Sequence, residues 1–330
     1  MIEKETLFVL GAGAGVPYKF PDAQGLRDSI INNSYRKYAE LDTQFSTGGG
    51  IEVFNNWDYD NFNKFTREFL YFVNPSIDLF LAMHPEYVSI GKAAIVLALN
   101  EREENYSKII RNQTNTYDWM EHLYSNFLIK GITNNKVEEV QKFKRNRVSF
   151  ITFNYDRSLE YFLWTALNSL TKVINREEVG ELYSVIKIYH MYGDLGLFND
   201  VINGERRSNP FGGIKHIGQL DYISQNIKTI HERDALPNQD EVVEMFTKAE
   251  RIYFMGFGFA EENIKALHLE KVKFDQKKIY LTGKGLEDKI KGILPLTTPS
   301  FHTRVQSYLT HIVQNNFATT DCLNMIKNFL

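Results

Sequence analysis

Cysteine, long apolar runs and charge of one sign are all scarce in this sequence, and each scarcity excludes a class of protein. Cys322 is the only cysteine, so the chain can form neither an internal disulfide nor a thiolate zinc cluster. The longest uninterrupted apolar run, residues 93–99, is far shorter than the roughly 20 residues that span a bilayer. The N-terminus has acidic residues before its short apolar run, unlike a secretory signal. We therefore expect a cytoplasmic protein with no membrane association.

The charges are close to balanced. There are 38 Lys and Arg against 41 Asp and Glu, which leaves a formal net charge of −3. This balance gives no general attraction to nucleic acid, so we expect no direct nucleic-acid binding. The 330 residues are 43% hydrophobic, which is enough to bury a core and excludes disorder as the main state.

Short apolar runs, each followed by glycine or small polar residues, alternate with segments of helical periodicity. Such runs are typical of strands that are covered on both faces in a parallel sheet. The expected strands are residues 7–10, 148–153, 185–190, 251–255 and 278–281. The alternation predicts an α/β fold with a Rossmann-like doubly wound parallel sheet. In such sheets, ligands bind beyond the carboxyl ends of the strands.

A long helical stretch separates the first expected strand from the second. Its apolar residues recur at three- and four-residue spacing, as in Phe62, Phe65 and Phe69. We expect a helical insertion here and one domain over the whole chain. The expected parts are a Rossmann-like core at residues 1–45 and 148–300, a mostly helical insertion or cap at 46–147, and C-terminal helices at 301–330.

A glycine loop follows the first expected strand and consists of Gly11, Ala12, Gly13, Ala14 and Gly15. Glycine allows the backbone to approach a phosphate closely, and free N–H groups at the start of a helix attract the anion. The G-x-G-x-G spacing differs from the G-x-G-x-x-G of dehydrogenases, which disfavours an NAD-dependent oxidoreductase. The alternative is a tight turn that binds no ligand.

Polar side chains follow two later strands. The Asn154 amide can bond a ribose hydroxyl or a water, and Asp156 can bind ligand or simply cap the next helix. His190 ends the third expected strand near Gly193, where a histidine facing a crevice can act as a general base. A packed or surface histidine is the alternative. The histidines show no H-x-x-x-H pair, so we expect no metal.

Four blocks of the sequence together resemble the sirtuin-like NAD-consuming domains of bacterial antiphage defence systems. They are LFVLGAGAGVPYKFPDAQGLR, ITFNYDRSLE, VIKIYHMYGDLG and RIYFMGFGFAEENI, in the order found in that family. The resemblance implies that the first block binds the pyrophosphate and adenosine side of NAD⁺, that Asn154 contacts the nicotinamide ribose, and that a histidine acts as base. The implied NAD⁺-binding and catalytic residues are Gly11, Ala12, Gly13, Ala14, Gly15, Asn154, Asp156, His190, Gly256, Gly258 and Asn263.

Three departures from the family pattern bear on the chemistry. Gly15 stands where the family usually has Ser, so one hydroxyl contact is missing. Tyr192 directly precedes Gly193, at the place where the family often has its catalytic histidine. His190 is two residues earlier and shares a strand face with position 192 because side chains alternate, so both remain candidates. The paired cysteines of deacylating sirtuins are absent, which agrees with NAD⁺ hydrolysis and argues against peptide deacylation.

The resemblance thus implies an NAD⁺ hydrolase that acts as an abortive-infection effector, with NAD⁺ as substrate and no metal. Such an enzyme must be silent until triggered. We therefore expect activation by a homo-oligomer or by a separate sensor or ATPase partner. The helical region at residues 61–140 is either a docking surface for that partner or a cap over the NAD⁺ site. The alternative function is a non-catalytic NAD or ADP-ribose sensor module, which would not need a catalytic histidine.

Overall fold

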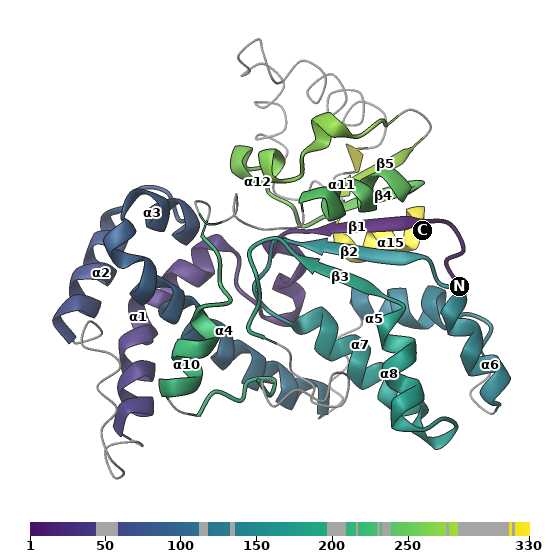
Figure 1. Ribbon diagram of the computed structural model, residues 1–330, viewed down its shortest axis with the longest axis horizontal. Coiled ribbons are helices and arrows are strands. Elements are labelled where there is room, and N and C mark those ends of the chain that lie inside the picture. Colours follow the sequence, from purple (N-terminus) through teal and green to yellow (C-terminus); the bar gives the residue numbers. More distant parts are fainter. Residues whose placement is uncertain are drawn as a thin grey trace.

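A parallel sheet forms the centre of the computed structural model (Figure 1). The structure describes residues 1–43, 59–111, 118–132, 136–196, 209–215, 217–229, 232, 239–274, 277–282, 317–318 and 321–330. Within these residues the sheet has six strands in the order β3-β2-β1-β4-β5-β6. The strands are β1 (Thr6–Leu10), β2 (Val148–Thr152), β3 (Lys187–His190), β4 (Arg251–Met255), β5 (Lys278–Thr282) and β6 (Phe317–Ala318).

The direction in which strands are added reverses beside β1. The chain proceeds from β1 outward to β2 and β3, and then returns to place β4 on the other side of β1. At such a switch point the loops after the two central strands diverge and leave a crevice. The sequence prediction of a Rossmann-like doubly wound α/β fold is confirmed.

Each central strand is buried on both faces because its side chains alternate between two apolar clusters. Leu7 and Val9 contribute to the first face of the sheet, and Phe8 and Leu10 to the second. The first face is covered by α1 (Ala23–Thr43), α2 (Tyr59–Tyr71), α3 (Ile77–Met83), α4 (Val88–Arg111), α10 (Ile217–Ser224), α11 (Gln239–Lys248) and α12 (Glu261–Ala266). The second is covered by α5 (Trp119–Leu123), α6 (Val137–Gln141), α7 (Ser158–Asn168), α8 (Arg176–Ser184) and α15 (Cys322–Phe329).

The insertion between β1 and β2 is helical, as expected, but it does not form one cap. Its helices α2 to α4 pack on the first face, as α1 of the predicted core does, whereas α5 and α6 pack on the second (Figure 1). The aromatic stripe of Phe62, Phe65 and Phe69 on α2 is fully buried. This stripe is therefore core, and it offers no surface for a partner.

The C-terminal region differs from the expected helices. Its described part contains a short strand, β6, which pairs with β5, and a single helix, α15. A two-residue strand leaves no periodicity to detect in a sequence. Residues 283–316 of the expected core and C-terminal helices lie outside the described part. Among the described helices, none is long and apolar enough to cross a membrane.

Candidate functional site

A pocket of about 690 Å³ opens at the carboxyl ends of β1, β2 and β4. The segments after these strands line it, together with the starts of α1 and α3. The predicted site residues that it brings together are Gly11, Ala12, Gly13, Asn154, Asp156, Gly256, Gly258 and Asn263. Ala14 and Gly15 instead line a much smaller adjoining cavity, and His190 lines neither.

The glycine loop is held mainly by its own backbone. Gly11 N–H donates to the Met255 carbonyl at 3.0 Å, and Gly13 N–H donates to the Gly256 carbonyl at 3.0 Å. Two further N–H groups, those of Ala14 and Gly15, donate within the loop. Only the Ala12 N–H finds no acceptor among the described residues. The predicted phosphate cradle is thus much poorer in free donors than the glycine spacing implies.

Close packing between two loops explains why this segment needs glycine. A Cβ on Gly11 would lie 2.5 Å from the Gly256 carbonyl oxygen, and one on Gly13 would lie 2.9 Å from the Gly256 Cα. Gly256 itself has φ +58, and its Cβ would lie 2.1 Å from the Ala14 nitrogen. Only glycine fits such contacts. These glycines therefore join the ends of β1 and β4, whether or not a ligand is bound.

Gly11→Ala is expected to lower the free energy of unfolding by about 1–3 kcal/mol, since the new methyl group overlaps backbone that cannot yield. Gly258→Ala is the matched control, because a Cβ there meets nothing within 4 Å. The control should unfold like the wild type, while its methyl group enters the pocket and weakens ligand binding. Urea unfolding measures the stability of both variants. Equal stability of Gly11→Ala and wild type would contradict the close packing.

Asn154 lines both the pocket and the adjoining small cavity, and its side chain carries a buried polar atom. Its backbone N–H donates to the Thr152 hydroxyl at 3.1 Å, and its backbone carbonyl accepts from the His190 ring. The side-chain oxygen Oδ1 is buried and finds no hydrogen-bond partner among the residues that the structure describes. Leaving such an atom unpaired costs free energy, so native proteins rarely do so without a reason. A ligand hydroxyl in the pocket would supply the missing donor.

His190 lines neither cavity, so its expected role as base stays a prediction that this geometry does not favour. Its Nε2 pairs with the Glu160 carboxylate on α7, and its Nδ1 lies 2.9 Å from the Asn154 carbonyl oxygen. Burial by itself lowers the pKa of His190, but the Glu160 charge outweighs it and raises this pKa to about 9. The ring is therefore protonated at neutral pH, with both nitrogens engaged. It is not placed to accept a proton in the pocket.

Tyr192, unlike His190, lines the pocket. The argument that residues 190 and 192 share a strand face fails because β3 ends at His190 and the chain turns at Met191 and Tyr192. The Tyr192 ring packs in the core of the first face, and its hydroxyl donates to Asn263 Oδ1 at 2.7 Å. Tyr192 and Asn263 thereby link the segments after β3 and β4 across the pocket.

All the charged side chains that line the described pocket are acidic: Asp22, Asp78, Asp156 and Glu262. Burial raises the pKa of Asp156 to about 6, although the Ser158 N–H opposes this effect by donating to its carboxylate. Burial likewise raises the pKa of Asp78 to about 6, against the effect of a short hydrogen bond from the Tyr155 hydroxyl. At pH 7 the pocket is negative, which favours a ligand that carries or develops positive charge.

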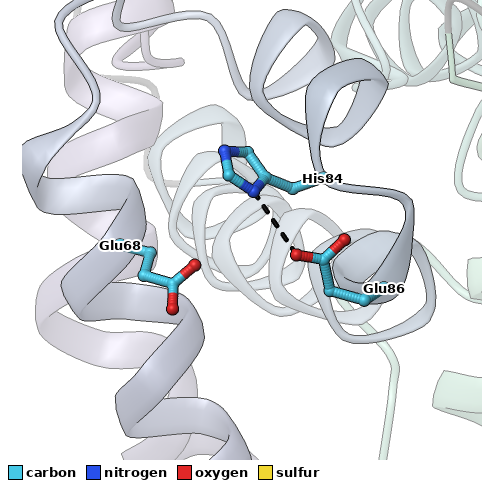
Figure 2. Close-up of side chains that lie close together, drawn as sticks. All are labelled: Glu68, His84 and Glu86. Atoms are coloured by element: carbon cyan, nitrogen blue, oxygen red, sulfur yellow. Dashed lines mark hydrogen bonds and ion pairs between the residues drawn. The ribbon is translucent and has the colours of Figure 1, made fainter.

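A second cluster of chemically active side chains lies outside this pocket. Figure 2 shows Glu68 on α2 facing His84 and Glu86, which follow α3. Their potential ligand atoms all lie within 4.8 Å of one another, and His84 Nδ1 is 3.4 Å from Glu86 Oε1. The sequence analysis missed this group because it considered only pairs of histidines. None of the three residues lines the pocket.

Two further pocket residues, Asp78 and Tyr155, are not among the residues predicted from the sequence, whereas Tyr192 is one of the two candidates named there. Tyr155 lies between the predicted residues Asn154 and Asp156. Asp78 has no local signal, because it reaches the pocket only through the packing of α3 on the first face of the sheet.

No protein-family model matches this chain, and no curated protein matches it either.

Proposed function

We propose that this chain binds NAD⁺ in the pocket and hydrolyses the nicotinamide–ribose bond, releasing nicotinamide and ADP-ribose. The observation that carries the proposal is the buried oxygen of Asn154, unpaired in the described part of the chain, on a residue that lines a pocket whose charged side chains are acidic. The pocket lies at the switch point of the sheet, where doubly wound folds take dinucleotides. Its volume of about 690 Å³ falls in the range of small-molecule sites.

The acidic lining suits this reaction better than it suits simple phosphate binding. The nicotinamide ring of NAD⁺ is cationic and leaves as a neutral molecule, so its departure needs no general acid. Positive charge then develops on the ribose, as in glycoside cleavage, and fixed carboxylates stabilise it. The Asn154 Oδ1 would accept a hydrogen bond from a ribose hydroxyl and hold the sugar against these carboxylates.

The resemblance to sirtuin-like defence domains supports the same proposal and adds a biological role. An enzyme that drains NAD⁺ from its own cell must be controlled, so an abortive-infection effector should act only after assembly or with a partner. We therefore propose that this chain is an abortive-infection effector and that assembly or a partner activates it.

Specific activity is expected to rise steeply with protein concentration, since assembly can complete or open a site. The measurement is nicotinamide released per mole of chain over a dilution series, with the molecular mass determined at each concentration. Full activity from a dilute monomer would rule out control by self-assembly.

A non-catalytic NAD or ADP-ribose sensor is the second candidate. It is favoured by the engagement of His190 with Glu160, which leaves the expected base outside the pocket. Calorimetric titration with NAD⁺ and with ADP-ribose, followed by chromatography for nicotinamide, separates the two functions. Release of nicotinamide supports the hydrolase. Binding of NAD⁺ without release at every protein concentration supports the sensor, and failure to bind either compound overturns both.

A further inference from the structure

Hydrolysis in this pocket requires a group that removes a proton from the attacking water. The residue expected for this task, His190, is protonated and held on the second face of the sheet. The pocket must therefore supply another base if it is to hydrolyse NAD⁺. Its acidic side chains are the available groups, and their hydrogen bonds distinguish them.

Two of the four carboxyls accept hydrogen bonds from backbone N–H groups at helix starts. Asp22 accepts from the Gly25 N–H at 2.8 Å at the beginning of α1. Asp156 accepts from the Ser158 N–H at 3.0 Å at the beginning of α7, and it is only 7% exposed. Glu262 stands in the first turn of the short helix α12. Helix capping accounts for Asp22 and Asp156 without any chemistry. Glu262 and Asp78 both stand in first turns, so a further contact must distinguish them.

Asp78 is different, because its side chain is held by another side chain of the pocket. It lies in the first turn of α3, whose N-terminus is capped by the Ser76 hydroxyl rather than by Asp78. Its Oδ1 accepts a short hydrogen bond from the hydroxyl of Tyr155, a largely buried residue that directly follows Asn154. The carboxyl of Asp78 is thus fixed relative to the segment that carries the unpaired amide, and it still borders the pocket.

We propose that Asp78 is the general base of this pocket and that Tyr155 is the residue that positions it. The inference rests on the proposed NAD⁺ hydrolysis. As the bond between ribose C1′ and the nicotinamide nitrogen breaks, its electron pair stays on the nitrogen and neutral nicotinamide leaves. A water oxygen bonds to C1′ and gives one proton to the Asp78 carboxylate, which later releases it to solvent. The products are ADP-ribose and nicotinamide.

The environment of Asp78 agrees with this role. Burial raises its pKa to about 6, and a base with a pKa near the working pH is both available and strong enough to accept a proton. The same carboxylate is negative at pH 7, so it also stabilises the positive charge on the ribose. The Tyr155 hydroxyl engages one carboxylate oxygen and so limits rotation of the group.

The experiment compares the wild type with Asp78→Asn, Asp78→Glu and Tyr155→Phe, using the full chain. Asp78→Asn should lower kcat for nicotinamide release by about 10²–10⁴-fold, with the dissociation constant for NAD⁺ nearly unchanged. Asp78→Glu keeps a carboxylate and should retain more activity than Asp78→Asn. Tyr155→Phe should lower kcat by about tenfold, because it removes one hydrogen bond to a charged group. Asp60→Asn, in the exposed first turn of α2, removes the same charge outside the pocket and should behave as wild type.

Thermal unfolding shows whether each variant is folded. Asp78→Asn should keep its stability, because an asparagine oxygen can still accept the hydrogen bond from the Tyr155 hydroxyl. A folded Asp78→Asn variant with wild-type kcat overturns the inference. So does a variant whose entire defect is weaker NAD⁺ binding, because a base acts after binding. A wild-type protein that binds NAD⁺ but never releases nicotinamide overturns the proposed function, and this outcome is visible before any variant is made.

Discussion

Asn154→Ala is expected to reduce nicotinamide release from NAD⁺ by at least about a hundredfold while the protein remains fully folded. The amide follows β2 at the pocket, and its Oδ1 is buried without a partner. Its loss removes the contact that would hold the ribose beside the carboxylates. Steady-state kinetics with NAD⁺, together with calorimetric binding, measures the effect on kcat and on affinity.

The same substitution separates a ligand-binding amide from a structural one. A structural amide loses hydrogen bonds when truncated and destabilises the fold, whereas the Asn154 oxygen has none with the residues that the structure describes. Thermal unfolding of Asn154→Ala should therefore match the wild type or lie slightly above it. Asn32→Ala, on the exposed surface of α1, is the control for truncating an asparagine. Wild-type affinity and turnover in Asn154→Ala would mean that NAD⁺ is bound elsewhere.

Glu103 and Arg157 should produce the largest effects on stability. Their side chains are 0% and 2% exposed, and they form a bidentate pair with N–O distances of 2.5 and 3.0 Å. Arg157 also donates to the carbonyls of Gly196 and Asn209 at 2.6 and 2.7 Å, and Glu103 accepts from the Gly212 N–H at 3.0 Å. The pair therefore fastens α4 and the start of α7 to two segments that follow β3.

Removing one partner leaves the other charge buried and unpaired. Glu103→Met and Arg157→Met are each expected to lower the free energy of unfolding by about 3–5 kcal/mol. The double variant should lose clearly less than the sum of the two, because neither charge is then left alone. Glu104→Gln is the matched control, since Glu104 pairs with Lys108 on the exposed surface of the same helix and should change stability by less than about 1 kcal/mol. Additive single effects in urea unfolding would contradict the coupling.

The sequence by itself determined five of the six described strands, and with them the fold class. A strand covered on both faces must be apolar throughout, so residues 251–255 predict β4 without error, and β2 and β5 are each placed to within one residue. The sequence also predicted most of the segments that line the pocket. Parallel strands end at the same edge of a sheet, so the segments beginning at Gly11, Asn154 and Gly256 had to meet there.

Only the tertiary structure decided which side chains enter the pocket. His190 and Tyr192 are two residues apart, yet they lie on opposite faces of the sheet because the strand ends between them, and strand alternation no longer applies after that point. Asp78 is 77 residues away in the sequence from the Tyr155 that holds it, and no local pattern records such a contact. The sequence predicted a role for Gly11 and Gly13 in binding phosphate, whereas the close approach of the Gly256 backbone, which requires glycine there, comes from a segment distant in the chain. Local periodicity encodes burial, whereas the direction of a side chain at a strand end depends on how the chain turns and on what packs against it.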